Sequence, residues 1–187
     1  MELFTERLIL RDFKADDWPA VLAYQTDPLY LRYYPWTGRT PQEVKEFVQM
    51  FLDQQADTPR LKFQLAVTLQ SNQALIGNCG VRMDTVAARQ GSIGYELAPV
   101  HWGLGYATEA AQTMLAYGFT ELGLHRIWAA TVPENRGSRR VLEKLGMQLE
   151  GRLCEVEYYK GRWWDTLIYA ILEDVWRNRQ TSGSLRS

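Results

Sequence analysis

The stretch YELAPVHWGLGYATEAA, residues 95–111, decides the fold. It ends a strand that we expect over residues 92–98, passes through a glycine-rich turn and enters a helix. Apolar residues over 107–122 recur at alternating steps of three and one, which is typical of one face of an amphipathic helix. The stretch therefore predicts a strand, a tight turn and a long helix in direct succession.

The turn carries small residues where it meets the helix, namely Gly103, Gly105 and Ala107. They allow close approach of a ligand to the backbone, and the unpaired N–H groups of the first helical turn attract a phosphate. We expect a pyrophosphate site here; the alternative is that the glycines serve only a tight turn. A nucleotide P-loop does not fit, because Tyr106 stands where that motif has lysine. A dinucleotide fingerprint fits poorly, because Thr108 takes its third small position and no acid follows at the required distance.

The flanking sequence predicts one α/β domain over residues 1–180, with a mixed sheet, and a polar tail over 181–187 that we expect to fray. Expected strands cover 7–11, 63–69, 74–83, 127–132, 148–159 and 164–172. Further helices are expected from Asp16-Asp17, from Pro41, and from Asn135 as N-cap to Gly146, with a proline-broken aromatic loop over 28–41.

Composition limits the class of protein. Of 187 residues, 46% are hydrophobic, 12% aromatic and 23% charged, which is the balance of a globular domain. The net charge of −1 leaves no basic field for nucleic acid, and no stretch is long and apolar enough for a membrane span. Two cysteines, Cys79 and Cys154, have no metal-ligand spacing and do not form a disulfide framework. We expect a cytoplasmic protein without a metal.

Three motifs in order resemble the GNAT N-acetyltransferases, and within them the RimJ/RimL-like branch of ribosomal-protein alanine acetyltransferases. They are the opening TERLILR over 5–11, the Gly103-x-Gly105-x-Ala107 turn, and Asn135-x-x-Ser138 followed by LGM over 145–147. The resemblance covers roughly residues 3 to 175. It implies a mixed, centrally splayed β-sheet flanked by helices, with acetyl-coenzyme A as cosubstrate. The implied contacts of this carrier are its pantetheine with Leu97 and Ala98, its pyrophosphate with Trp102, Gly103, Leu104, Gly105, Tyr106, Ala107 and Thr108, and further contacts with Asn135 and Ser138.

The sequence departs from the family pattern at three positions. Trp102 stands where the broader superfamily has Gln or Arg, which leaves the pyrophosphate site intact because its donors are backbone amides. Related N-terminal acetyltransferases have a catalytic Tyr and a Glu where this sequence has Leu142 and Ala130. The acid and base of that group therefore do not transfer.

Three residues are candidates for the chemistry. Ser138, in the first turn of a helix and on its apolar face, would stabilise the departing thiolate. Asn135 would cap that helix and bond the pantetheine arm. Glu96 would lead protons away from the amine through water, with Tyr95 and Leu97 facing the opposite side of the strand. For each, a purely structural role is the alternative, and Glu155 and Glu157 are fallback bases.

The expected reaction is acetyl transfer to a primary amine by direct attack in a ternary complex. A protein N-terminal α-amine needs less help from a base than a lysine amine, because its pKa lies near 7.7 to 8.0. A polyamine or aminoglycoside is an alternative acceptor, and a catalytically silent acyl-coenzyme A module is an alternative function. Tyr33, Tyr34 and Trp36 are candidates for a wall of the acceptor pocket, and either a monomer or a homodimer is compatible with the sequence.

Overall fold

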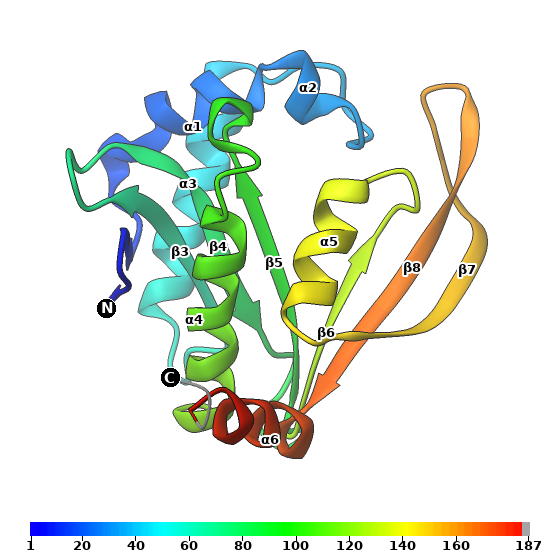
Figure 1. The fold of residues 1–187 in the computed structure, drawn as a ribbon. Coiled ribbons are helices and arrows are strands. Elements are labelled where there is room, and N and C mark those ends of the chain that lie inside the picture. Colours follow the sequence, from blue (N-terminus) through cyan, green and yellow to red (C-terminus); the bar gives the residue numbers. More distant parts are fainter. Residues whose placement is uncertain (185–187) are drawn as a thin grey trace.

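The computed structural model describes residues 1–184, which form a mixed eight-stranded sheet with helices on both faces (Figure 1). The strand order is β1-β2-β3-β4-β5-β6-β8-β7, and neighbours are antiparallel except β5 and β6. The expected α/β class with a mixed sheet is confirmed. The strands are β1 (Glu2–Phe4), β2 (Leu8–Arg11), β3 (Lys62–Leu69), β4 (Leu75–Arg82), β5 (Gln90–Leu97), β6 (Arg126–Thr131), β7 (Gln148–Tyr159) and β8 (Arg162–Leu172).

The helices cover the sheet in two groups, each with its own apolar core. One core lies between the sheet and α4 with α5, and the other lies beneath α1, α2 and α3. Strand β3 serves both, since Leu65 and Val67 face the first core and Ala66 faces the second. The helical elements are η1 (Ala15–Asp17), α1 (Trp18–Gln25), α2 (Pro28–Leu31), α3 (Pro41–Ala56), η2 (Pro99–His101), α4 (Tyr106–Thr120), α5 (Arg136–Lys144) and α6 (Glu173–Ser184).

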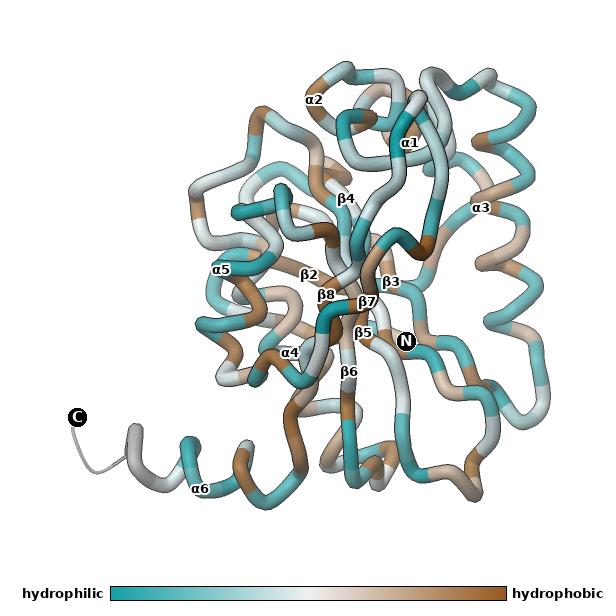
Figure 2. Tube along the Cα trace, turned by 90° about the vertical axis from the view of Figure 1, so that its right-hand side faces the viewer, coloured by the Kyte–Doolittle hydropathy of each residue, from teal (hydrophilic) through white to brown (hydrophobic). Residues whose placement is uncertain are grey.

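The surface helices follow the amphipathic pattern that places them. In α3 the buried residues Val44, Val48 and Phe51 recur at helical spacing. Most other residues of this helix are hydrophilic (Figure 2). Thr40 and Glu43 begin this helix with reciprocal side-chain to backbone hydrogen bonds. Burial of one stripe therefore fixes how α3 lies on the sheet.

The sheet opens in its middle. Strands β5 and β6 pair over only three positions, from Gln90 with Arg126 to Ser92 with Trp128, and then diverge (Figure 1). The turn that leads into α4 and the start of α5 both lie at the open end. The splayed sheet implied by the family resemblance is present, and it leaves one side of β5 without a neighbouring strand beyond Ser92.

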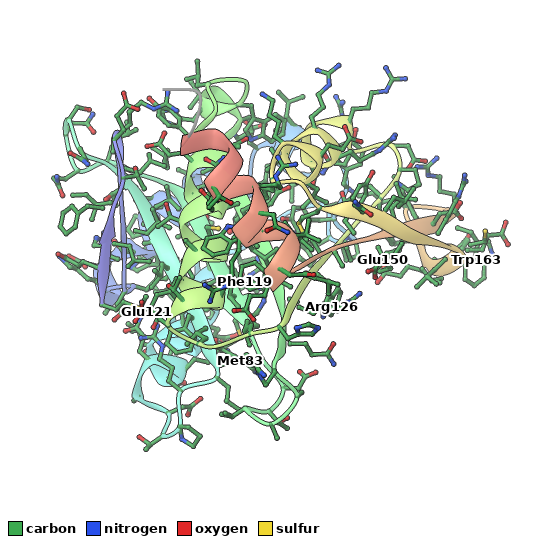
Figure 3. All side chains as sticks on the ribbon, turned by 60° about the horizontal axis from the view of Figure 1, so that its bottom comes forward. Met83, Phe119, Glu121, Arg126, Glu150 and Trp163 are labelled. Carbon is green, nitrogen blue, oxygen red and sulfur yellow. The ribbon has the colours of Figure 1, made fainter. Side chains whose placement is uncertain are left out.

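The C-terminal part differs from the sequence prediction. Residues 181–184 were expected to fray, but they form the last turn of α6. This helix is held by Trp176, whose ring lies 5.3 Å from that of Phe119, and by Arg179, which donates to the carbonyl of Lys144. Figure 3 shows Phe119 beside α6. Residues 181–184 continue this helix, with Thr181 Oγ1 donating to Arg177 O (3.1 Å), so the tail predicted to begin at 181 begins inside α6. The remainder of that tail, 185–187, lies outside the described residues.

Two further elements were not predicted. The short helix α2 interrupts the loop expected over 28–41, and the side chain of Asp27 accepts a hydrogen bond from Leu29 N (2.8 Å) at its start. Strand β1 adds a short edge to β2. No helix within residues 1–184 is long and apolar enough to cross a membrane.

Candidate active site

The turn before α4 exposes a row of backbone N–H groups. Gly103 and Gly105 have φ of 77° and 86°, a backbone conformation that side chains disfavour. Beyond Trp102, the first backbone N–H that donates to an acceptor in the described part of the chain is that of Glu109, which bonds to Gly105 O (3.0 Å). Within residues 1–184, the N–H groups from 103 to 108 have no acceptor in the protein. They are the donors that the sequence assigns to a pyrophosphate.

Long-range contacts fix the shape of this turn. Arg7 donates to Leu104 O (3.0 Å), and its guanidinium lies 4.5 Å from the centre of the Tyr106 ring. Glu109 accepts from Thr5 Oγ1 (2.5 Å), Arg7 N (2.9 Å) and Arg7 Nε (2.7 Å). Burial alone would raise the pKa of the Glu109 carboxyl, but these hydrogen bonds outweigh burial and hold the pKa below its ordinary value. Glu109 therefore joins the N-terminal strands to α4.

The open edge of β5 offers a second set of backbone groups. Ala98 N donates to Ile76 O of β4 (2.8 Å), so the alternation of strand hydrogen bonds directs the backbone of Tyr95 and Leu97 to the opposite side, where β6 has diverged. The indole of Trp102 donates to Leu97 O (2.8 Å). Both backbone groups of Ala98 are bonded within the protein, since its carbonyl accepts from His101 N. Tyr95 and Leu97 are thus better placed than Ala98 to pair with an extended ligand.

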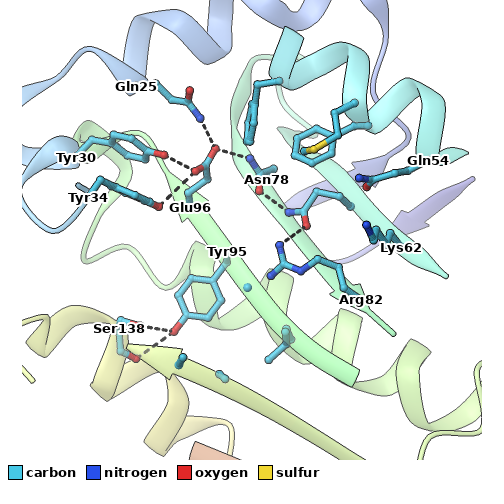
Figure 4. A pocket seen from close by; sticks show the side chains of 18 of the residues that line it. Gln25, Tyr30, Tyr34, Gln54, Lys62, Asn78, Arg82, Tyr95, Glu96 and Ser138 are labelled. Atoms are coloured by element: carbon cyan, nitrogen blue, oxygen red, sulfur yellow. Dashed lines mark hydrogen bonds between the residues drawn. The ribbon is translucent and has the colours of Figure 1, made fainter. Parts of the chain in front are cut away.

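Helix α5 brings Ser138 to the open edge. The side chain of Asn135 accepts from Ser138 N (3.0 Å), as expected for an N-cap. The hydroxyls of Ser138 and Tyr95 lie 3.1 Å apart, and Tyr95 Oη also donates to Ser138 O (3.1 Å). Burial raises the pKa of the Tyr95 phenol, so Tyr95 is a neutral donor. Two hydroxyls, from β5 and α5, therefore meet where the sheet opens (Figure 4).

Glu96 lies on the other face of β5, and its carboxylate is held by five donors. A carboxylate has about four lone-pair sites, so this one is saturated and does not have the solvated environment considered from the sequence. Burial raises the pKa of all three contributing tyrosines, and the charge of Glu96 raises them further. The donors are Tyr24 Oη (2.7 Å), Gln25 Nε2 (3.0 Å), Tyr30 Oη, Tyr34 Oη (3.4 Å) and Asn78 Nδ2 (2.5 Å).

A single cavity of about 470 Å³ connects the two faces of β5. Glu96 and Tyr34 line it on one side, and Tyr95 and Ser138 line it on the other (Figure 4). The volume is in the range of small-molecule sites. The carboxylate cluster and the paired hydroxyls therefore face one shared space.

Other candidates from the sequence take different places. Tyr34 and Trp36 line the cavity, with rings stacked 4.7 Å apart, whereas Tyr33 does not line it and donates instead to Glu134 O (3.0 Å). Glu155 and Glu157 are exposed on β7 and do not line the cavity.

Several lining residues were missed by the sequence analysis. Tyr30 and Arg82 are among them, and so is Tyr95 as the partner of Ser138. Only β4 gave a usable signal, because Asn78 and Arg82 are polar residues on one face of an otherwise apolar strand.

The fold and the open sheet define an acyl-transferring class of α/β protein, and comparisons with known proteins identify the family. A family model described as an acetyltransferase (GNAT) domain matches residues 7–148. The N-acetyltransferase YnaD of Bacillus subtilis is 37% identical over 176 residues, which are 94% of this chain and 99% of that protein. The chain therefore belongs to the GNAT family of N-acetyltransferases.

Solved structures agree with this assignment. An acetyltransferase of the GNAT family from Bacillus anthracis is 35% identical, with a TM-score of 0.81 over 93% of this chain and 99% of that chain. The ribosomal-protein acetyltransferase RimL, solved with coenzyme A, shares the fold at 19% identity, with a TM-score of 0.81 over 94% and 99% of the two chains. The resemblance to the GNAT family is confirmed, and RimL shares its fold.

Proposed function

We propose that the chain transfers the acetyl group of acetyl-coenzyme A to a primary amine by direct attack within a ternary complex. The observation that carries the proposal is the cavity, which joins the Glu96 cluster to the Ser138–Tyr95 hydroxyls at the open edge of β5. Neither Cys79, buried in the core, nor Cys154, exposed on β7, lines this space, which agrees with a mechanism without an acyl-cysteine.

The carrier would bind along the open end of the sheet. The free N–H groups from 103 to 108 and the positive end of the α4 dipole suit its pyrophosphate. The backbone of Tyr95 and Leu97 suits its extended amide arm, with Asn135 close to Ser138 at the start of α5. Acetyl-coenzyme A supplies the activated acetyl thioester when it is bound.

Ser138 and Tyr95 would stabilise the departing thiolate. A free thiol has a pKa near 8.5, well below that of a serine hydroxyl, so Ser138 acts by hydrogen bonding and not by giving up its proton. Tyr95 keeps Ser138 in place through its bond to the Ser138 carbonyl. Because that bond uses the single phenol hydrogen, the donor to the thiolate is the hydroxyl of Ser138. Leu142 lines the cavity as an apolar residue, so these two hydroxyls stand in for the tyrosine of related enzymes.

Glu96 would act on the amine through the tyrosine hydroxyls that are hydrogen-bonded to its carboxylate. Since five donors saturate the carboxylate, a proton from the amine reaches it by way of a tyrosine hydroxyl. Tyr34 is the best placed of them, because it lines the cavity and its hydrogen bond to Glu96 is the longest, at 3.4 Å. An α-amine is partly neutral at physiological pH and needs little more than this relay.

The test is release of free thiol from acetyl-coenzyme A over a panel of primary amines, together with calorimetry of carrier binding. Gly105→Val should abolish carrier binding, because a β-branched side chain at a φ of 86° distorts the turn. Gly123→Val is the matched control, since Gly123 also has a positive φ but follows the other end of α4. Normal carrier binding by Gly105→Val would overturn the loop assignment. Binding without thiol release from any amine would instead indicate a catalytically silent module.

A further inference from the structure

The cavity carries more positive than negative charge. Arg39, Lys62 and Arg82 line it, and Glu96 is the one carboxylate among its lining residues within the described part of the chain. The five donors to Glu96 are neutral groups, so none of the three cations is its partner. Over residues 1–184, none of these cations has a carboxylate within 4.0 Å. The excess of positive charge is therefore uncompensated within the protein.

Arg82 is the most buried of the three cations. It donates to Gln64 Oε1 (3.2 Å), Gln64 donates to Asn78 Oδ1 (2.5 Å), and Asn78 leads on to Glu96. Two neutral amides thus separate the guanidinium from the carboxylate. Burial lowers the pKa of Arg82, as expected for a cation removed from water without an anion beside it. Such an arrangement costs free energy unless a ligand supplies the anion.

Lys62 raises the free-energy cost of the unpaired Arg82 because of its position opposite Arg82 in the sheet. It stands directly opposite Arg82 in the antiparallel pair of β3 and β4, so the two side chains share one face of the sheet (Figure 4). Like charges directly opposite each other destabilise a sheet. An anion between them would turn a repulsion into two attractions.

The loop between α2 and α3 adds donors without acceptors. Trp36 Nε1 and Arg39 Nε are buried, and neither has a hydrogen-bond partner within the described residues, while both side chains line the cavity. Buried polar groups are nearly always paired, so unpaired donors in a cavity indicate a ligand with acceptor atoms. Two elements far apart in the sequence, this loop and the β3–β4 pair, therefore supply donors for the same kind of group.

Gly94 directs Arg82 towards the reacting side. A Cβ atom at Gly94 would lie 2.2 Å from Arg82 Nη2, so the guanidinium passes over the position where any other residue would place a side chain. Gly94 lies two residues before Glu96 and on the same face of β5, and both line the cavity with Arg82. The bound anion and the reacting amine would consequently belong to one small molecule.

We propose that the acceptor is a compact primary amine that bears its own carboxylate, as a free α-amino acid does. Arg82 binds the carboxylate through two parallel N–H donors, with Lys62 beside it, while the amine faces the phenols on Glu96. This inference rests on the proposed acetyl transfer and adds the acceptor class. A polyamine would bring further positive charge to these cations; the carboxylates that would suit it, Glu46, Asp53 and Asp57, do not line the cavity but a second hollow beside it, which shares Met50 and Gln54 with it.

The experiment compares matched acceptors that differ in one charge: free amino acids, the same amino acids as C-terminal amides, and spermidine. Thiol release gives kcat and KM for each with the full-length chain and saturating acetyl-coenzyme A. We expect kcat/KM for the free amino acid to exceed that of its amide by at least tenfold. Arg82→Met should raise KM for the free amino acid by about 10- to 150-fold, the range for a hydrogen bond to a charged group, with kcat/KM for the amide changed less than threefold.

Two further variants keep the test independent of folding. Lys62→Met, at an exposed side chain, should raise KM for the free amino acid by about two- to fivefold. Arg177→Met removes an equivalent charge on α6, where Arg177 pairs with Glu173, and should change neither acceptor. If Arg82→Met unfolds, Arg82→Lys replaces it, and the loss of bidentate geometry should still raise KM for the free amino acid.

Each outcome decides one of the two proposals. Equal or better use of amides or of spermidine would overturn the acceptor class and leave acetyl transfer intact. A preference that survives in Arg82→Met and Lys62→Met would also overturn it. If wild-type protein releases thiol with no amine, the proposed function fails, and calorimetry with N-acetylglycine then tests the anion site alone. Binding that Arg82→Met abolishes supports that site, and absence of binding to the wild type refutes it.

Discussion

The paired hydroxyls at the open edge of β5 give the sharpest prediction about catalysis. Ser138→Ala removes the donor to the departing thiolate, and Tyr95→Phe removes the hydroxyl that holds this donor in place; both leave the backbone of α5 and β5 unchanged. A hydrogen bond to a charged group contributes about 1.5–3 kcal/mol, which corresponds to a loss of about 10- to 150-fold in kcat. Tyr95→Phe should lie at the lower end, because it removes the bond to Ser138 O (3.1 Å) that positions the serine but leaves the serine hydroxyl itself.

The double variant separates cooperation from independent action. If both hydroxyls serve one thiolate, the losses in the double variant should be smaller than the product of the single losses, because each single change already disturbs the pair. The assay is steady-state thiol release for kcat, with calorimetry for the Kd of acetyl-coenzyme A. We expect Kd to change less than threefold, since the carrier is held mainly by the backbone donors from 103 to 108. A loss confined to Kd, or kcat within threefold of wild type in both single variants, would refute the assigned roles.

Three more predictions follow from contacts around the site. Glu96→Gln puts an NH₂ group among neutral donors and should lower the unfolding free energy by about 1–3 kcal/mol, seen as a lower Tm, whereas the exposed control Glu157→Gln should not. Glu109 has a lowered pKa, so its stabilising effect is present above about pH 4.5 and lost as the pH falls through the lower folded-state pKa. The unfolding free energies of wild type and Glu109→Gln, measured with urea, should therefore converge in acid. A difference that stays constant with pH would contradict this. Gly94→Ala must displace Arg82 and should raise acceptor KM with little change in the Kd of the carrier; an unchanged KM would show that Arg82 is not a binding group.

Most of the fold was predictable because its elements carry strong local patterns. The period of α4 and the alternation of β3 are set by residues that each element must bury, so they can be recognised without knowing the partner. The elements that were missed depend on distant contacts. Helix α6 packs Trp176 on Phe119 and α2 has only four residues, too few for a period to show.

The site was predictable only where neighbours in sequence cooperate. Asn135 and Ser138 lie in one helical turn, so the hydrogen bond between them follows from their spacing. The Glu96 cluster could not be derived in this way, because its donors Tyr24 and Tyr30 lie 72 and 66 positions away from it. Spacing in the sequence predicts which residues share a face or a turn of one element. It does not predict which residues of different elements come into contact, because that depends on how the whole sheet folds.

The anchoring of the glycine-rich turn before α4 by Thr5 and Arg7 has a practical consequence for anyone who trims or rearranges this chain. The groups that brace the turn stand 97 to 104 positions upstream of it, so the turn gains its shape only after the first and central thirds of the polypeptide have come together. A fragment that starts after Arg7 would retain every glycine of the motif and still lack the brace. Deletion series and circular permutants should therefore be judged by ligand binding, since secondary-structure content alone would not register this loss.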